Sequence, residues 1–123
     1  MDYFDERPGR TRLASLSMDQ DQCISSINEA FRQTLGYTIN GLQGAKLESL
    51  LTRSSRIFYQ IYFLPMIKLN GEIKGMQLSF KSNIGESVPM TVDVVSRVTE
   101  GQEIYNVFLA PLQQKFDNNN GEG

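Results

Sequence analysis

The sequence contains no histidine, no tryptophan and only one cysteine, and each of these absences excludes a kind of functional site. Histidine is the commonest general acid–base group and a usual ligand of haem iron and of zinc, so such sites must use other residues. Tryptophan would supply a common group for stacking against flavin. Because Cys23 is alone, an internal disulfide is impossible, and a reducing compartment is the simplest context. We therefore expect no cofactor and no metal site, with only non-covalent flavin left open.

An excess of basic charge and a long apolar run are also missing. The formal net charge is -2, so we expect no nucleic-acid partner. The longest nearly apolar run, residues 61–69, is interrupted by Pro65 and Lys68 and is far too short to cross a bilayer. No apolar stretch follows Met1 as a secretion signal would. We expect a cytoplasmic domain, and its parent protein can still be anchored in a membrane elsewhere.

The composition that remains is globular and fits one domain. Hydrophobic residues make up 40% of the 123 residues and charged residues 21%. A chain of this length can bury a core without metals or disulfides. Residues 1–12 are polar and predict a flexible leader, whereas residues 113–123 predict the start of a connector and a disordered tail. The folded domain is expected over residues 13–112.

The first half of this domain predicts two short strands followed by helices. Loose alternation at 13–18 and 22–27 indicates a hairpin. Ile27, Phe31 and Leu35 then fall on one helical stripe, with Ser26 or Asn28 as the N-cap and Gly36 as the stop. A longer helix follows Thr52, and Pro65 should kink it or end its regular part. Its expected buried stripe is Phe58, Ile61, Tyr62, Pro65, Met66 and Leu69.

The second half alternates with period 2 and predicts three long strands, at residues 73–81, 88–98 and 103–112. Turns at 83–86 and 99–102 separate them, so the strands should form an antiparallel meander. Strands grouped apart from helices are typical of an α+β fold with an antiparallel sheet. The helices must then cover one face of that sheet.

Residues of the first helix resemble the early helical motif of PAS domains. The residues that carry the likeness are Ile-Asn-Glu-Ala-Phe at 27–31, Leu-Gly-Tyr-Thr at 35–38, Leu42 and Gly44. Residues 55–59, with Pro65 and Gly71, are similar to a PAS subgroup of bacterial sensor proteins. In that subgroup the domain is joined to histidine kinase, diguanylate cyclase or serine phosphatase output modules. The resemblance covers about residues 13–112.

This resemblance implies a five-stranded antiparallel sheet whose last strand lies beside its first, with helices enclosing a cavity. It also implies a regulatory sensor and interaction domain in signal transduction, of the kind found in two-component systems. The signal would pass through homodimer contacts and through a connector that starts at residues 112–116, toward an output module in the same chain. The alternative is an isomerase-like enzyme or a stand-alone ligand-binding protein, in which Asp93 would act with Tyr59 or Tyr62. We favour the non-catalytic reading and assign no catalytic residue.

The candidate sites follow from these predicted faces. Light-sensing members of the family carry a reactive cysteine after Gly44, and residues 45–49 have none. A small apolar ligand would have Asn106 as its polar contact, with Tyr62 as a second candidate, unless the same residues simply fill the core. Arg53 and Arg56 either meet a carboxylate ligand or form a surface pair. The predicted pocket lining is Phe58, Ile61, Tyr62, Met76, Leu78, Phe80, Met90, Val92, Asn106 and Phe108. The predicted dimer interface is Leu13, Val95, Tyr105, Val107 and Leu109.

Overall fold

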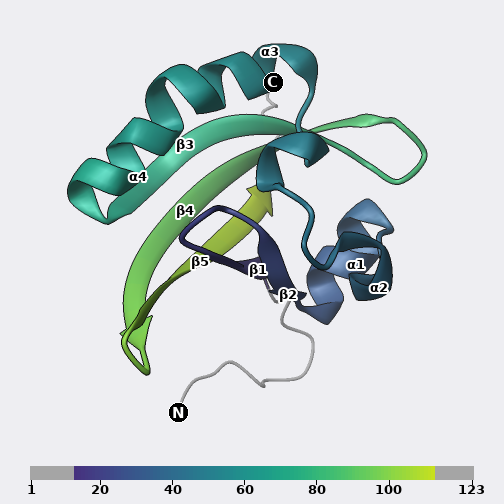
Figure 1. Ribbon diagram of the computed structural model, residues 1–123. Coiled ribbons are helices and arrows are strands. Elements are labelled where there is room, and N and C mark those ends of the chain that lie inside the picture. The colour runs from purple at the N-terminus through teal and green to yellow at the C-terminus, as the bar shows by residue number, and fades with distance from the viewer. Residues whose placement is uncertain (1–12, 113–123) are drawn as a thin grey trace.

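A computed structural model describes residues 13–112, which are built around a five-stranded antiparallel sheet in the order β2-β1-β5-β4-β3 (Figure 1). The predicted leader, connector and tail lie outside the described residues. The sheet confirms the implied topology, because β5 pairs with β1 on one side and β4 on the other. The strands are β1 (Ala14–Asp19), β2 (Ile24–Ile27), β3 (Glu72–Lys81), β4 (Ser87–Thr99) and β5 (Gln102–Pro111).

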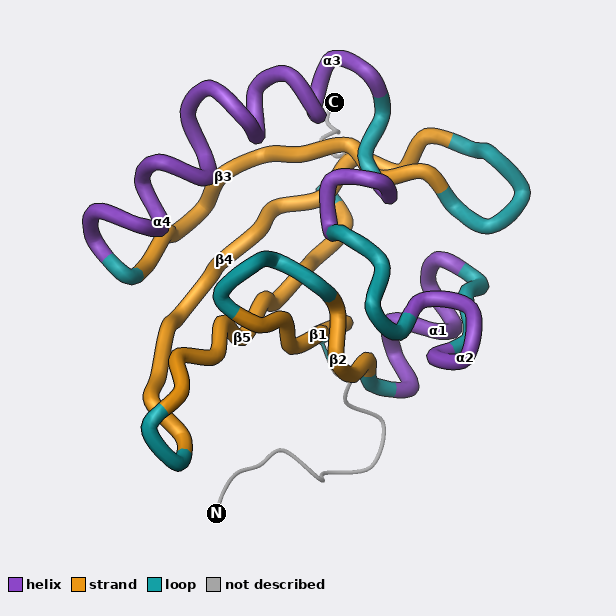
Figure 2. Tube along the Cα trace, viewed as in Figure 1, coloured by secondary structure: helices purple, strands orange, loops and turns teal. Residues whose placement is uncertain are grey.

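The helices lie between β2 and β3 in the chain and cover one face of the sheet (Figures 1 and 2). A group of short helices packs near β1 and β2, and one long helix runs along β3 from Arg53 to Asn70. No helix within residues 13–112 is long and apolar enough to span a membrane. The helical segments are α1 (Glu29–Leu35), α2 (Ile39–Leu42), η1 (Leu47–Leu50), α3 (Arg53–Phe58), the π-helical η2 (Tyr59–Phe63) and α4 (Leu64–Asn70).

Asn28 decides where the first helix begins. Its side-chain oxygen accepts hydrogen bonds from the backbone N–H groups of Phe31, at 2.9 Å, and Ser15, at 3.0 Å. Its amide nitrogen donates to the Leu13 carbonyl at 2.9 Å. Asn28 rather than Ser26 is therefore the N-cap, and the same side chain ties α1 to β1. At the other end Gly36 has φ of 85°, as expected for the predicted stop.

The hairpin between β4 and β5 sets which residues face the helices. Glu100 and Gly101 form its tight turn, and both have positive φ, which suits a two-residue hairpin turn. This turn aligns Val94 with Val107 and Val92 with Leu109. All four side chains are fully buried on the helix-covered face, which we call the inner face.

The predicted faces of β5 are wrong. Tyr105, Val107 and Leu109 were expected on the outer face, but they are buried on the inner face. Asn106 and Phe108 were expected to line the pocket, but they lie on the opposite, outer face. Both alternating sets of β5 are largely apolar, so hydrophobicity alone does not separate them. The pairing with β4 does, because cross-strand partners share a face.

The predicted face of the long helix is also wrong. Phe58, Ile61 and Tyr62 are exposed, and the side chains buried against the sheet are the second apolar series on this helix. Pro65 does not end the helix, which continues to Asn70, but a π-helical segment, Tyr59–Phe63, interrupts the regular α-helix shortly before the proline. There the Leu64 N–H donates to the Tyr59 carbonyl, five residues back. The buried series is Tyr59, Phe63 and Ile67.

Candidate functional site

The inner face is filled by side chains from the sheet and the long helix. Leu78 and Phe80 of β3 and Met90 and Val92 of β4 are buried there, as predicted, and Met76 is half-buried beside them. The other predicted lining residues lie elsewhere: Asn106 and Phe108 across the sheet, and the exposed side chains of the long helix on its far side. Five of the ten predicted residues thus belong to one cluster, and their binding of a ligand stays a prediction.

Tyr59 supplies the polar group at this inner face that sequence reasoning assigned to Asn106. The residue is 1% exposed, and its ring stacks on Phe63 with centroids 5.2 Å apart. Its hydroxyl has no hydrogen-bond partner within residues 13–112. A buried polar group without a partner costs about 1–3 kcal/mol. The spacing of Tyr59, Phe63 and Ile67 at i, i+4 and i+8 was the signal that could have identified it.

The surroundings of Tyr59 keep its hydroxyl protonated. Burial raises the pKa of this phenol, and the charges of Glu48 and Tyr105 raise it further. Tyr105 is itself buried on β5, and burial followed by the charge and hydrogen bond of Glu103 raises its pKa as well. Glu48 lies on η1, where its carboxylate accepts a hydrogen bond from Gln60 at 3.0 Å. Tyr59 is therefore a hydrogen-bond donor at neutral pH.

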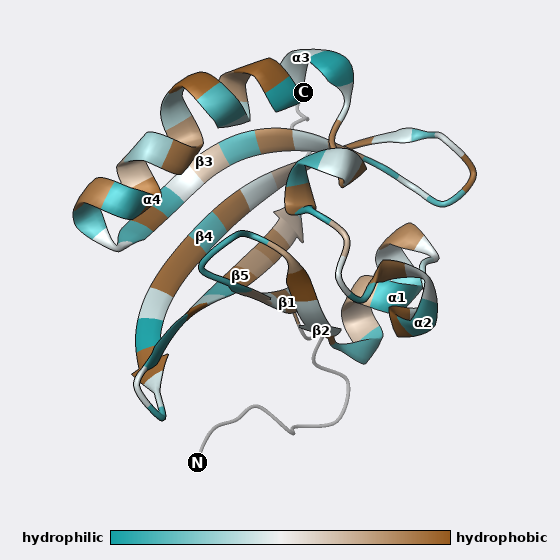
Figure 3. Ribbon diagram, viewed as in Figure 1, coloured by the Kyte–Doolittle hydropathy of each residue, from teal (hydrophilic) through white to brown (hydrophobic). Residues whose placement is uncertain are grey.

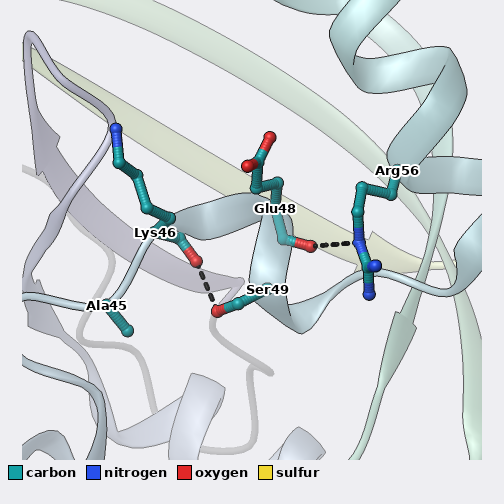
Figure 4. A pocket seen from close by; sticks show the side chains of 5 residues that line it. All are labelled: Ala45, Lys46, Glu48, Ser49 and Arg56. Carbon is teal, nitrogen blue, oxygen red and sulfur yellow. Dashed lines mark hydrogen bonds between the residues drawn. The ribbon is translucent and has the colours of Figure 1, made fainter.

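An open hollow of about 500 Å³ lies between η1 and the start of the long helix, lined by Ala45, Lys46, Glu48, Ser49 and Arg56 (Figure 4). Arg56 donates hydrogen bonds, each 3.3 Å long, to the carbonyls of Glu48 and Leu51. Lys46 reaches the Asp21 carbonyl instead, at 2.9 Å. Figure 4 shows the two cationic groups at opposite ends of the hollow. They do not converge on one anion, and Arg56 serves to tie η1 to the helix.

Asp93 lies on the outer face, as predicted. Its carboxylate accepts a hydrogen bond from the Gly75 N–H at 2.7 Å. Gly75 has φ of 70° in an irregular part of β3, so Asp93 stabilises the local backbone there. The enzyme alternative requires Asp93 in a cavity with a tyrosine, and Tyr59 lies on the other side of the sheet. Among residues 13–112 no group of three or more cysteine, aspartate or glutamate side chains is placed to hold a metal ion.

The outer face of the sheet carries exposed apolar side chains at its centre. Phe108 of β5 is 37% exposed and Val95 of β4 is 41% exposed. Asn106 lies opposite Val95 and two residues before Phe108 on β5, and it accepts a hydrogen bond from the Ser17 hydroxyl at 3.0 Å. Leu13 is exposed where the chain enters β1. Of the predicted interface residues, Leu13 and Val95 are exposed and the three on β5 are buried, whereas Phe108 is exposed on β5.

Solved PAS domains share this arrangement of sheet and helices. A PAS domain of a protein from Colwellia psychrerythraea has a TM-score of 0.73 at 12% identity, covering 84% of this chain and 88% of its own. A PAS domain from a two-component sensor histidine kinase has a TM-score of 0.70 at 12% identity, covering 81% and 85%. That of nitrogen regulation protein NR(II) from Vibrio parahaemolyticus has a TM-score of 0.64 at 17% identity, covering 81% and 89%. The described residues therefore have the PAS fold, which the resemblance of residues 27–44 implied.

A curated bacterial protein is similar in sequence. Phosphoserine phosphatase RsbP of Bacillus subtilis (strain 168) is 25% identical over 105 residues, which are 85% of this chain. The match spans 26% of the length of RsbP, so this chain corresponds to about a quarter of that relative. No family model matches the sequence.

We expect the Tyr59→Phe variant to be as stable as the wild type, or more stable by up to about 1 kcal/mol, because it removes a buried hydroxyl without a partner. Urea unfolding measures the difference. The matched control is Tyr37→Phe, whose hydroxyl donates to the Lys81 carbonyl at 2.7 Å. That change should cost about 0.5–1.5 kcal/mol. A clear loss of stability in Tyr59→Phe would show that its hydroxyl has a partner after all.

Proposed function

We propose that this chain is a regulatory PAS domain of a bacterial signalling protein and relays a signal through contacts between two copies. The observation that carries the proposal is the exposed apolar centre of the outer sheet face, at Phe108 and Val95. Phe108 lies on β5, the middle strand of the sheet, and Val95 lies on β4 beside it. An apolar centre surrounded by polar side chains is the usual anatomy of a protein interface.

The position of β5 supports a relay toward an output module. This strand pairs with β1 and β4 and thus lies in the middle of the sheet. At its end the Leu112 N–H donates to the Pro89 carbonyl at 3.2 Å, which fixes where the chain leaves the sheet. A partner pressing on Phe108 would act on the same strand that leads to residues 113–116. The proposed output is a module in the same parent chain, of kinase, cyclase or phosphatase type.

Sedimentation velocity tests this interface directly. We expect a wild-type dimer whose fraction rises with concentration, and we expect Phe108→Lys to raise the dimer dissociation constant at least roughly tenfold. The folded monomer should tolerate a lysine at position 108, because this position lies opposite Asp93 on β4. The control is Ile61→Glu, an equally drastic change on the exposed side of the long helix. A wild-type protein that stays monomeric at high concentration, or a Phe108→Lys variant that dimerises normally, contradicts the proposal.

Binding of a small ligand is a second candidate function, and the Tyr59 hydroxyl favours it. This buried donor lies among the apolar side chains of the inner face, so a ligand there would be largely apolar with one hydrogen-bond acceptor. A small molecule that co-purifies with the wild type, and is lost from the Tyr59→Phe variant, would support this function. A molecule retained unchanged by the variant would place its binding elsewhere.

A further inference from the structure

The long helix carries a second apolar surface on the side that faces away from the sheet. Ile61 is 73% exposed, Leu69 is 81% exposed and Ile57 is 51% exposed. Phe58 and Tyr62 lie beside them with ring centroids 5.4 Å apart. We call these five residues the outer helix stripe. Figure 3 shows hydrophobic residues recurring along the long helix after its hydrophilic first turn.

The stripe is unusual because the opposite side of the same helix is already buried. Tyr59, Phe63 and Ile67 pack against the sheet and are at most 1% exposed. A surface helix normally pairs one apolar side with one polar side, and a helix that is apolar on both sides is normally covered on both. Apolar patches of several hundred Å² on a monomer often mark a functional surface. The stripe is therefore expected to have an occupant.

A groove beside the helix extends this surface. It has a volume of about 360 Å³ and lies between α4 and β3. Met66 connects groove and stripe, because it is one helical turn from both Tyr62 and Leu69. Methionine side chains adapt to different partners, which suits a docking surface. The groove is lined by Met66, Asn70, Glu72, Ile73, Lys74 and Met76.

The charged side chains on the helix that carries the stripe are all positive. Residues 53–70 contain two arginines and one lysine and no aspartate or glutamate, although the whole chain has a net charge of -2. Arg53 and Lys68 are exposed toward the two ends of the stripe, and Lys74 is exposed beside the groove. Arg56 is engaged with backbone carbonyls, and Glu72 is the single acidic residue of the groove. An acidic partner would be attracted to this surface.

We propose that the outer helix stripe and the adjacent groove dock an amphipathic α-helix whose apolar face is flanked by acidic side chains. The stripe follows the long helix over about four turns. A second helix can lie along it with the two helix axes about 8–10 Å apart. A second copy of this helix fits less well, because antiparallel pairing would bring Arg53 of one copy near Lys68 of the other. This surface is separate from the outer sheet face and does not depend on the proposed dimer.

A designed peptide tests the recognition. The probe is a fluorescein-labelled 18-residue amphipathic peptide with a leucine stripe flanked by glutamates, and its matched control carries lysine at each glutamate position. Fluorescence anisotropy with the whole chain measures binding. We expect the acidic peptide to bind at least roughly tenfold more tightly than the lysine peptide, with an affinity that falls as salt is added.

Two variants of the protein test where on its surface the peptide binds. We expect Ile61→Glu to weaken binding of the acidic peptide at least roughly tenfold, because it puts a charge in the middle of the stripe. Val98→Glu should leave binding unchanged, since Val98 is also 73% exposed but lies near the turn between β4 and β5. Both positions are exposed, so both variants should fold, and circular dichroism checks that they do.

Four results would overturn the proposal. Equal binding of both peptides, or binding of neither, would exclude an acidic helix as the partner. An equal loss of peptide affinity in Ile61→Glu and Val98→Glu would show that the stripe is not the binding site. A wild-type dimer that Ile61→Glu dissociates would show that a second copy covers the stripe. Binding to phosphatidylglycerol vesicles that Ile61→Glu abolishes, without binding of the acidic peptide, would show that the occupant is an anionic membrane.

Discussion

Replacing Val107 with lysine is expected to destabilise the protein by more than about 4 kcal/mol or to prevent folding, because the change buries a charge without a partner. Val107 is fully buried on the inner face and pairs with Val94 of β4. A lysine at the centre of this face has no short path to water. Urea unfolding, monitored by circular dichroism, measures the loss.

The matched control for this experiment is Val95→Lys. Val95 is 41% exposed on the outer face of the neighbouring strand, and Glu72 of β3 lies opposite it. A lysine there reaches water and a carboxylate, so at a protein concentration where the chain is monomeric the expected change in unfolding free energy is within about 0.5 kcal/mol. Similar losses from both variants would mean that the faces of the sheet are assigned incorrectly.

Replacing Phe63 with alanine is expected to cost about 3–5 kcal/mol of unfolding free energy. The side chain is fully buried between the long helix and the sheet, and its ring stacks on that of Tyr59. The matched control is Phe58→Ala, five residues earlier on the same helix, where the side chain is 39% exposed. That substitution should cost about 1 kcal/mol.

The comparison of these two variants decides which side of the helix is buried. Chemical denaturation of both proteins under the same conditions gives the two losses. A larger loss of unfolding free energy from Phe58→Ala than from Phe63→Ala would mean that Phe58, Ile61 and Tyr62 are the buried side chains, as simple helical periodicity suggested. The outer helix stripe would then not be exposed, and the proposed docking surface would be contradicted.

The order of elements could be predicted because each depends on local signals. Asn28 and Gly36 mark the ends of α1, and the turn at residues 99–102 separates the last two strands. The likeness of residues 27–44 to PAS domains agreed with that order. A fold can be predicted from sequence when local signals and the global pattern agree in this way.

The faces of β5 could not be predicted from hydrophobicity, because Tyr105 and Val107 alternate with Ile104 and Phe108. The hairpin register does contain the answer. Once Glu100 and Gly101 are taken as the two turn residues, counting back places Val107 opposite Val94. Val94 alternates with Val92 and Met90, which were expected on the inner face, so this pairing would have placed Val107 inside.

The long helix was ambiguous for a different reason. Its sequence has two apolar series, and periodicity alone does not say which one meets the sheet. The π-helical segment before Pro65 also changes the angular spacing of residues along the helix. The Tyr59 hydroxyl was not assigned to the inner face, because the other series was expected to be buried.

Native mass spectrometry of freshly purified protein tests most directly whether this domain with the PAS fold acts through contacts between two copies. It reports the number of chains and any retained small molecule in one spectrum. We predict a species of two chains whose share grows with protein concentration and falls in the Phe108→Lys variant. A spectrum that shows single chains without a bound molecule at every concentration would contradict both the proposed relay and the proposed ligand.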